Sequence, residues 1–84
     1  MSDQDTTPAA DAAYRAAYHI AWVGASNQKG VERSIAEHTA TVGADHVAVR
    51  AMVGHLEFLR GNGLGPEMEE LSEVRENGVR LGLA

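Results

Sequence analysis

Residues 45–60, DHVAVRAMVGHLEFLR, place apolar side chains on two sides of a predicted helix. One line of apolar residues consists of Val49, Met52, Val53, Leu56 and Leu59, and a second, nearly opposite line consists of Val47, Ala51 and Phe58. A helix with one apolar stripe lies on a surface, whereas a helix with two apolar faces needs neighbours on both. The segment is therefore predicted to be the central helix of a small bundle, or a helix whose second face meets another copy of the chain.

The residues before this segment predict two further helices. Thr7 and Pro8 have the order of an N-cap followed by proline at the first helical position, where the missing N–H costs nothing. Gly24 is suited to end that helix, and Ser26 or Asn27 is suited to cap the next one. These signals predict helices over residues 8–24 and 28–42.

Glycine and proline also mark the limits of the later helices. Gly43 can adopt the left-handed conformation that ends a helix, and Asp45 is then expected to cap the central helix over residues 45–60. The glycine-rich loop 61–65 follows, Pro66 opens a fourth helix, and the Asn-Gly pair at 77–78 is expected to end it. The fold class is therefore predicted as all-α, a small bundle of four helices at about 8–24, 28–42, 45–60 and 66–77.

The two ends of the chain are expected to lie outside the helical domain of residues 8–78. Residues 1–7 are polar and acidic and are predicted to be a disordered tail. Residues 79–84 alternate apolar with small or polar residues, which is the period of a strand, so we expect an extended C-terminal arm.

Length and composition restrict how such a domain can be stabilised and where it can act. A chain of 84 residues buries only about 60–65% of its unfolded surface. It contains no cysteine, which excludes disulfides and thiolate zinc sites and leaves oligomerisation as the most open means of support. The acidic start is unlike a signal peptide, and the most apolar run is far shorter than the roughly 20 residues of a membrane span. We expect a soluble, cytoplasmic protein that does not associate with membranes.

The sequence contains no pattern typical of a catalytic, metal or cofactor site. Its four histidines are His19, His38, His46 and His55, and no two of them are three or four residues apart. They therefore do not form the pair that presents two metal ligands on one helix face. His38 lies on the apolar stripe of helix 28–42, so a hydrogen-bonded core or interface histidine is the expected role. No nucleophile with a neighbouring base is visible, and we predict no cofactor and no enzymatic activity.

The helices predicted at 28–42 and 45–60, joined by a turn with Gly43, have the gross pattern of a helix-turn-helix. DNA-reading helices need donors for phosphates and guanine edges. The second helix opens with Asp45, His46 and aliphatic residues, and Arg50 is the one arginine near its start. The net charge of −5 also disfavours contact with a phosphate backbone. Nucleic acid is therefore not the expected partner, and a small DNA-binding regulator is kept as the alternative function.

Several large apolar residues lie off the main apolar faces of the predicted helices or in the C-terminal arm. The candidate partner interface consists of Tyr18, Trp22, Val47, Phe58, Leu81 and Leu83. Aromatic residues beyond the needs of one core are typical anchors of protein–protein contacts. We therefore predict a non-enzymatic protein–protein interaction module that forms a homodimer, with another protein as a further possible partner. A helical enzyme or ligand binder with a site assembled between subunits is the further alternative.

Overall fold

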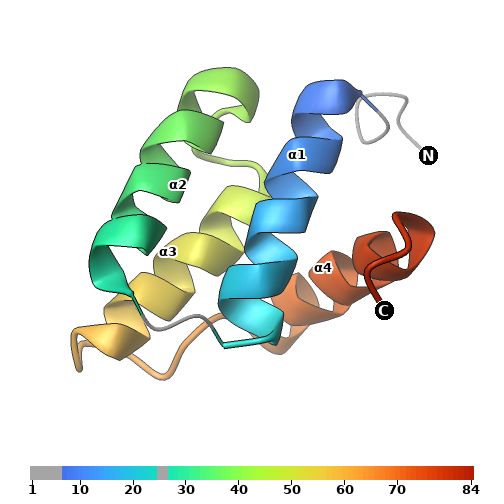
Figure 1. Cartoon of the computed structure of the whole chain (residues 1–84). Coiled ribbons are helices and arrows are strands. Elements are labelled where there is room, and N and C mark those ends of the chain that lie inside the picture. The colour runs from blue at the N-terminus through green and yellow to red at the C-terminus, as the bar shows by residue number, and fades with distance from the viewer. Residues whose placement is uncertain (1–6, 25–26) are drawn as a thin grey trace.

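The computed structural model describes residues 7–24 and 27–84, and Figure 1 shows four α-helices packed into one bundle. The elements are α1 (Pro8–Ala17), the π-helical η2 (Tyr18–Trp22), α2 (Gln28–Val42), α3 (Val47–Leu59) and α4 (Met68–Arg80). No strand occurs in these two described ranges. The predicted all-α small bundle is confirmed, and the tail predicted for residues 1–7 lies outside the described residues except for Thr7.

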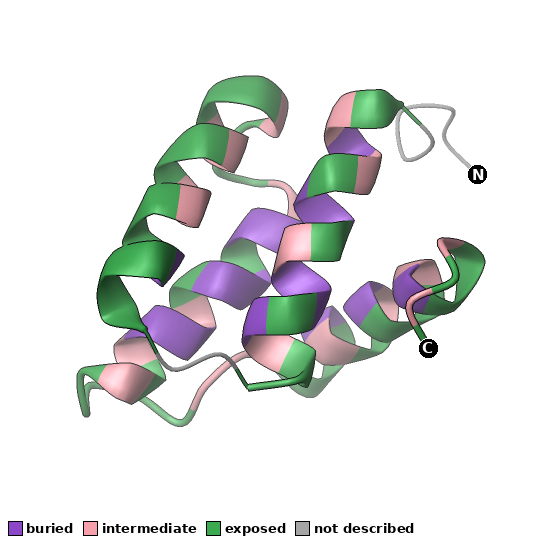
Figure 2. Cartoon of the chain, in the orientation of Figure 1, coloured by how far each residue is buried: buried purple, intermediate pink, exposed green. Residues whose placement is uncertain are grey.

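The central position predicted for α3 is confirmed. It packs against α1, η2, α2 and α4, so helices of the same chain cover both of its sides. Its buried residues are Ala48, Val49, Ala51, Met52, His55 and Leu56. Figure 2 shows this buried band along α3 behind the other helices. On the second apolar face, Ala51 is buried and Val47 half-buried, whereas Phe58 remains 53% exposed.

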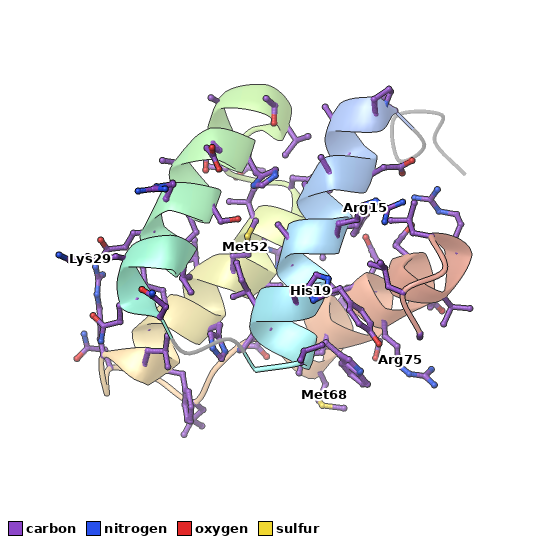
Figure 3. The ribbon with its side chains drawn as sticks, in the orientation of Figure 1. Arg15, His19, Lys29, Met52, Met68 and Arg75 are labelled. Carbon is purple, nitrogen blue, oxygen red and sulfur yellow. The ribbon has the colours of Figure 1, made fainter. Side chains whose placement is uncertain are left out.

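Small residues on α1 allow the helices around α3 to approach closely. Ala10, Ala13 and Ala17 are at most 1% exposed. The largest fully buried side chains include Tyr14 of α1 and Met52 of α3. Figure 3 shows the Met52 side chain between α1 and α2. The core is therefore built of alanines that set short interhelical distances and a few large side chains that fill the remaining space.

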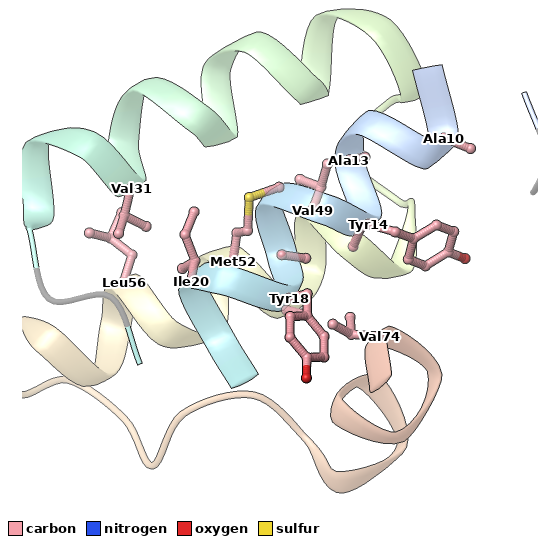
Figure 4. Close-up of a cluster of buried hydrophobic side chains, with 13 residues drawn as sticks. Ala10, Ala13, Tyr14, Tyr18, Ile20, Val31, Val49, Met52, Leu56 and Val74 are labelled. Carbon is pink, nitrogen blue, oxygen red and sulfur yellow. The ribbon is translucent and has the colours of Figure 1, made fainter. Parts of the chain in front are cut away.

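The buried side chains of the other elements complete this core in two directions (Figure 4). Val31 of α2 faces Leu56 of α3, while Tyr18 of η2 faces Val74 of α4. Val31 and Val74 are 1% and 0% exposed. Each outer helix therefore contributes at least one fully buried anchor to the core around α3.

The helix predicted over 8–24 consists of two parts. Thr7 is its N-cap, and the Thr7 hydroxyl accepts a hydrogen bond from the backbone N–H of Ala10 at 3.1 Å. After Ala17 the backbone widens into η2, where the N–H of Val23 donates to the carbonyl of Tyr18, five residues earlier. The prediction of one uninterrupted α-helix was wrong in this last turn.

The start of α3 also differs from the prediction. Asp45 was expected to cap the helix, but the N-cap is His46, whose Nδ1 accepts a hydrogen bond from the N–H of Ala48 at 3.1 Å. The His46 ring lies edge-on to Tyr14, with the ring centroids 5.1 Å apart. Contact with α1 therefore places an imidazole where local preference favours a carboxylate.

The fourth helix extends beyond its predicted end. It runs through Gly78 to Arg80, and its first turn begins at Met68 with Glu67 as N-cap rather than at Pro66. Gly78 is buried because the Tyr18 ring packs directly on its backbone. The low helix propensity of glycine predicts that the helix ends here. The helix continues instead, because the Tyr18 ring packs where a side chain at position 78 would lie.

The predicted extended arm is replaced by a compact helix end. Gly82 has φ +79°, and the Leu83 N–H donates to the carbonyl of Gly78 at 2.7 Å. This backbone reversal turns Leu81 and Leu83 toward the core, where both are partly buried. The alternating pattern therefore reflects a C-terminal cap with its apolar contacts rather than a strand.

The contact of Tyr18 with Gly78 makes alanine substitution a test of the packing. A Cβ at Gly78 would lie 2.7 Å from Cε2 of the buried Tyr18 ring. Gly78→Ala is therefore expected to destabilise the fold by about 1–3 kcal/mol, despite the better helix propensity of alanine. Chemical denaturation followed by circular dichroism measures this change.

Gly30→Ala is the matched control, since Gly30 also lies within a helix but its nearest heavy atom to an added Cβ is 3.7 Å away. This variant is expected to be about 0.5–1 kcal/mol more stable than the natural chain. Equal effects of the two substitutions would contradict the contact between Tyr18 and Gly78.

Candidate interaction surface

Five large apolar residues are exposed at one end of the bundle. This apolar end surface consists of Trp22, Val23, Phe58, Leu64 and Met68. Figure 1 shows that the end of η2, the loop after α3 and the start of α4 lie at the same end of the molecule. Their exposed fractions run from 42% for Trp22 to 101% for Leu64. Separate segments of the chain therefore bring exposed apolar side chains to the same end of the bundle.

Trp22 is held in place by two ring contacts. It stacks on Tyr18, with the ring centroids 6.5 Å apart and the planes 29° from parallel. The guanidinium carbon of Arg75 lies 5.7 Å from the centroid of the Trp22 ring. Figure 3 shows Arg75 and Met68 on the part of α4 that lies beside η2. The indole is therefore a fixed, half-exposed anchor rather than a freely moving side chain.

The loop that carries Leu64 is tied to the last turns of α3. The N–H of Gly61 donates to the carbonyl of Phe58 at 3.0 Å, and the N–H of Asn62 donates to the carbonyl of Glu57 at 2.8 Å. An added Cβ at Gly54 would lie 2.8 Å from Cα of Pro66, so the far end of the loop crosses α3 in backbone contact. Leu64 is therefore presented on a loop that is anchored at both ends.

Two of the six residues predicted as a partner interface belong to the apolar end surface, namely Trp22 and Phe58. Tyr18 is buried at 7% exposure against α4. Val47, Leu81 and Leu83 are half-buried and pack on the core of their own chain. These four side chains pack within their own chain. The apolar end surface therefore shares only Trp22 and Phe58 with the predicted interface.

Sequence reasoning missed the other three members of the surface. Val23 follows the π-helical turn, and Met68 has the helical spacing of an apolar stripe with Leu71 and Val74 but is 75% exposed. Leu64 had a readable signal, because a leucine between Gly63 and Gly65 in a short loop has little that can cover it. The exposure of Met68 follows from the path of the loop and could not be read from periodicity.

A polar cleft of about 290 Å³ lies between the start of α3 and α4. It is lined by Asp45, His46, Val47, Arg50, Glu69, Glu70 and Glu73. Arg50 forms an ion pair with Glu70 at 2.9 Å, and the carboxylate of Glu70 also accepts the backbone N–H of Glu67 at 3.1 Å. Tyr14 donates its hydroxyl proton to Glu73 at 3.2 Å. The cleft therefore joins α1, α3 and α4 through side chains that already bind one another.

Across residues 7–24 and 27–84, no group of three or more His, Cys, Asp or Glu side chains is arranged to hold a metal ion. His38 lies half-buried on α2, and its Nδ1 donates to the carbonyl of Ser34 at 2.7 Å. It is thus a hydrogen-bonded histidine on the inner stripe of its helix. His55 of α3 is more deeply buried, at 8% exposure, which the helical pattern did not single out.

The helix-turn-helix hypothesis gains no support from the surroundings of α3. Residues on most sides of this helix are buried, and Arg50 at its first exposed turn is paired with Glu70. Glu69 and Glu73 line the same cleft. Acidic side chains beside the one arginine repel a phosphate backbone. A DNA-binding regulator therefore stays the alternative hypothesis. Salt-dependent binding to duplex DNA that is lost in Arg50→Ala is the result that would favour it.

None of the helices in the described part of the chain combines the length and the apolar character needed to cross a membrane. Comparisons of the chain with protein-family models, with curated proteins and with solved structures give no match. Function is therefore argued from the surface and the clefts of this structure.

The ion pair in the polar cleft provides a test of its structural role. The Glu70 side chain is only 9% exposed, whereas that of Arg50 is 54% exposed. Arg50→Ala removes a charged partner from a carboxylate that is shielded from water, so we expect a loss of about 1–3 kcal/mol in unfolding free energy. Arg33→Ala, on the exposed side of α2, is the control and is expected to change stability by less than about 0.5 kcal/mol. Equal stability of the two variants would contradict this role.

Proposed function

We propose that this protein is a non-enzymatic interaction module that forms a homodimer in the cytoplasm through the apolar end surface. The observation that carries the proposal is that five of the seven exposed large apolar residues in the described part of the chain lie at one end of the bundle, namely Trp22, Val23, Phe58, Leu64 and Met68. Apolar clusters of this kind, with aromatic anchors, are typical of protein contacts.

The amount of exposed apolar surface is in the range that a specific contact requires. A standard interface buries about 800 Å² per partner, of which roughly 450 Å² is apolar. Two half-exposed aromatic rings contribute on the order of 200 Å². Leu64, Met68 and Val23 contribute on the order of another 250 Å². The five residues therefore supply about the apolar area of one half of a standard interface.

The pairing of side chains in the polar cleft supports an interaction module rather than an enzyme. The side chains of the polar cleft are engaged in structural pairs, Arg50 with Glu70 and Tyr14 with Glu73. A catalytic group must be able to reach a substrate, whereas these groups hold α1, α3 and α4 together. The exposed apolar residues have no comparable structural task, which supports a role for them in binding.

Substitution of Met68 tests the proposal with little risk to the fold. Met68 is 75% exposed at the first position of α4, where a carboxylate is favoured by the helix dipole. Met68→Glu is therefore expected to fold normally and to weaken the dimer at least tenfold, because a charge is buried in the interface. Sedimentation equilibrium at micromolar concentration measures the dissociation constant.

Val79→Glu is the matched control, since Val79 is 53% exposed on the same helix but near its opposite end. This variant is expected to dimerise as the natural chain does. A natural chain that stays monomeric at micromolar concentration would refute the homodimer. Equal weakening by the two substitutions would place the contact elsewhere.

A further inference from the structure

A groove runs along the outer side of α3, next to the apolar end surface. It has a volume of about 500 Å³ and is lined by Ala44, Arg50, Val53, Gly54, Gly65, Glu67 and Glu70. Within this lining, Val53 is 41% exposed and lies next to Gly54 in the chain. The groove therefore combines small and apolar residues with one arginine and two glutamates.

A close backbone contact holds the loop against α3 beside the groove. Pro66 crosses α3 at Gly54, where an added Cβ would be only 2.8 Å from Cα of Pro66. Gly65, the residue before Pro66, has φ +102°, a conformation that other residues rarely adopt. A side chain at position 54 would collide with the loop, and position 65 needs a backbone conformation that glycine adopts readily, so both glycines are needed for the loop to cross α3 here.

Leu64 lies immediately beside this groove and belongs to the apolar end surface. Its side chain is fully exposed, and the next residue, Gly65, lines the groove. The molecule thus presents a projecting apolar side chain next to a groove that contains the exposed Val53. A surface with both features is self-complementary, because one two-fold rotation can place each projection in the groove of the other copy.

We infer that, in the proposed homodimer, Leu64 of each copy enters the groove beside Val53 and Gly54 of the other copy. The inference rests on the proposed function and names the contact that determines its geometry. The occupant is a second copy because the chain itself supplies both halves of the contact. The apolar end surface already supplies the apolar area of about 450 Å² that each half of a stable dimer needs, and the exposed Val53 adds to it.

Disulfide trapping tests this geometry directly, since the natural chain has no cysteine. Leu64→Cys and Val53→Cys chains, one carrying a small tag, are mixed in equal amounts and oxidised. The mixed disulfide between the two variants is expected to exceed both symmetric disulfides several-fold. In a mixture of Leu64→Cys with Val79→Cys, the control pair, random collision gives no such excess.

Filling the groove provides an independent measurement. Val53→Phe adds volume to the groove at an exposed position, so the fold is expected to persist, as judged by circular dichroism, while the dimer dissociation constant rises at least tenfold. Leu64→Ala is expected to weaken the dimer to a similar extent, and the double variant no more than about as much as either single one. Additive effects would show that the two residues do not meet.

The possible outcomes separate the inference from the proposed function. A dimer that persists without the mixed disulfide, or that forms the symmetric Leu64→Cys disulfide instead, overturns the contact of Leu64 with the groove but keeps the homodimer. A natural chain that sediments as a monomer overturns both. A mixed disulfide in excess, with non-additive losses in Val53→Phe and Leu64→Ala, supports the inference.

Discussion

The burial of α3 by the rest of the chain is the constraint on which the structure depends. In 84 residues there is room for one well-buried helix, and α3 takes that place between α1, η2, α2 and α4. Close approach on several sides requires small residues, which Ala48 and Ala51 provide on α3 and Ala13 and Ala17 on α1. Buried apolar area accumulates mainly around this axis, so the outer helices are stabilised largely by what they contribute to it.

Two glycines show where local preference and tertiary contact differ. Gly54 and Gly78 both lie inside helices, where glycine is unfavourable, and each is in contact with another element through its missing side chain. The sequence predicted the all-α class, the order of the α-helices and the central place of α3, because these follow from apolar periodicity. It misplaced the end of α4, because the contact of Gly78 with Tyr18 joins residues sixty positions apart and leaves no periodic signal.

The candidate surface, like the fold, was predictable only in part from the sequence. Trp22 and Phe58 were recognisable as aromatic side chains off the main apolar faces, and both are exposed. Tyr18 lies four residues before Trp22 and projects from a similar side of its helix, but α4 packs on it and covers it. A helical wheel gives the direction of a side chain relative to its own helix and contains no information on which other helix passes there. The exposure of Met68 depends on the path of the loop before it.

The connection between fold and surface lies in the loop after α3. Because Gly54 admits Pro66 against the backbone of α3, the loop returns closely over the helix instead of extending into solvent. Along this path no residue of the described ranges covers Leu64, and Gly65 of the same loop lines the groove. A loop whose only task was to join α3 to α4 would not require an apolar residue at its most exposed position. The same backbone contact that completes the bundle therefore creates the projection and the groove, which is why we place the recognition of a second copy at this point of the fold.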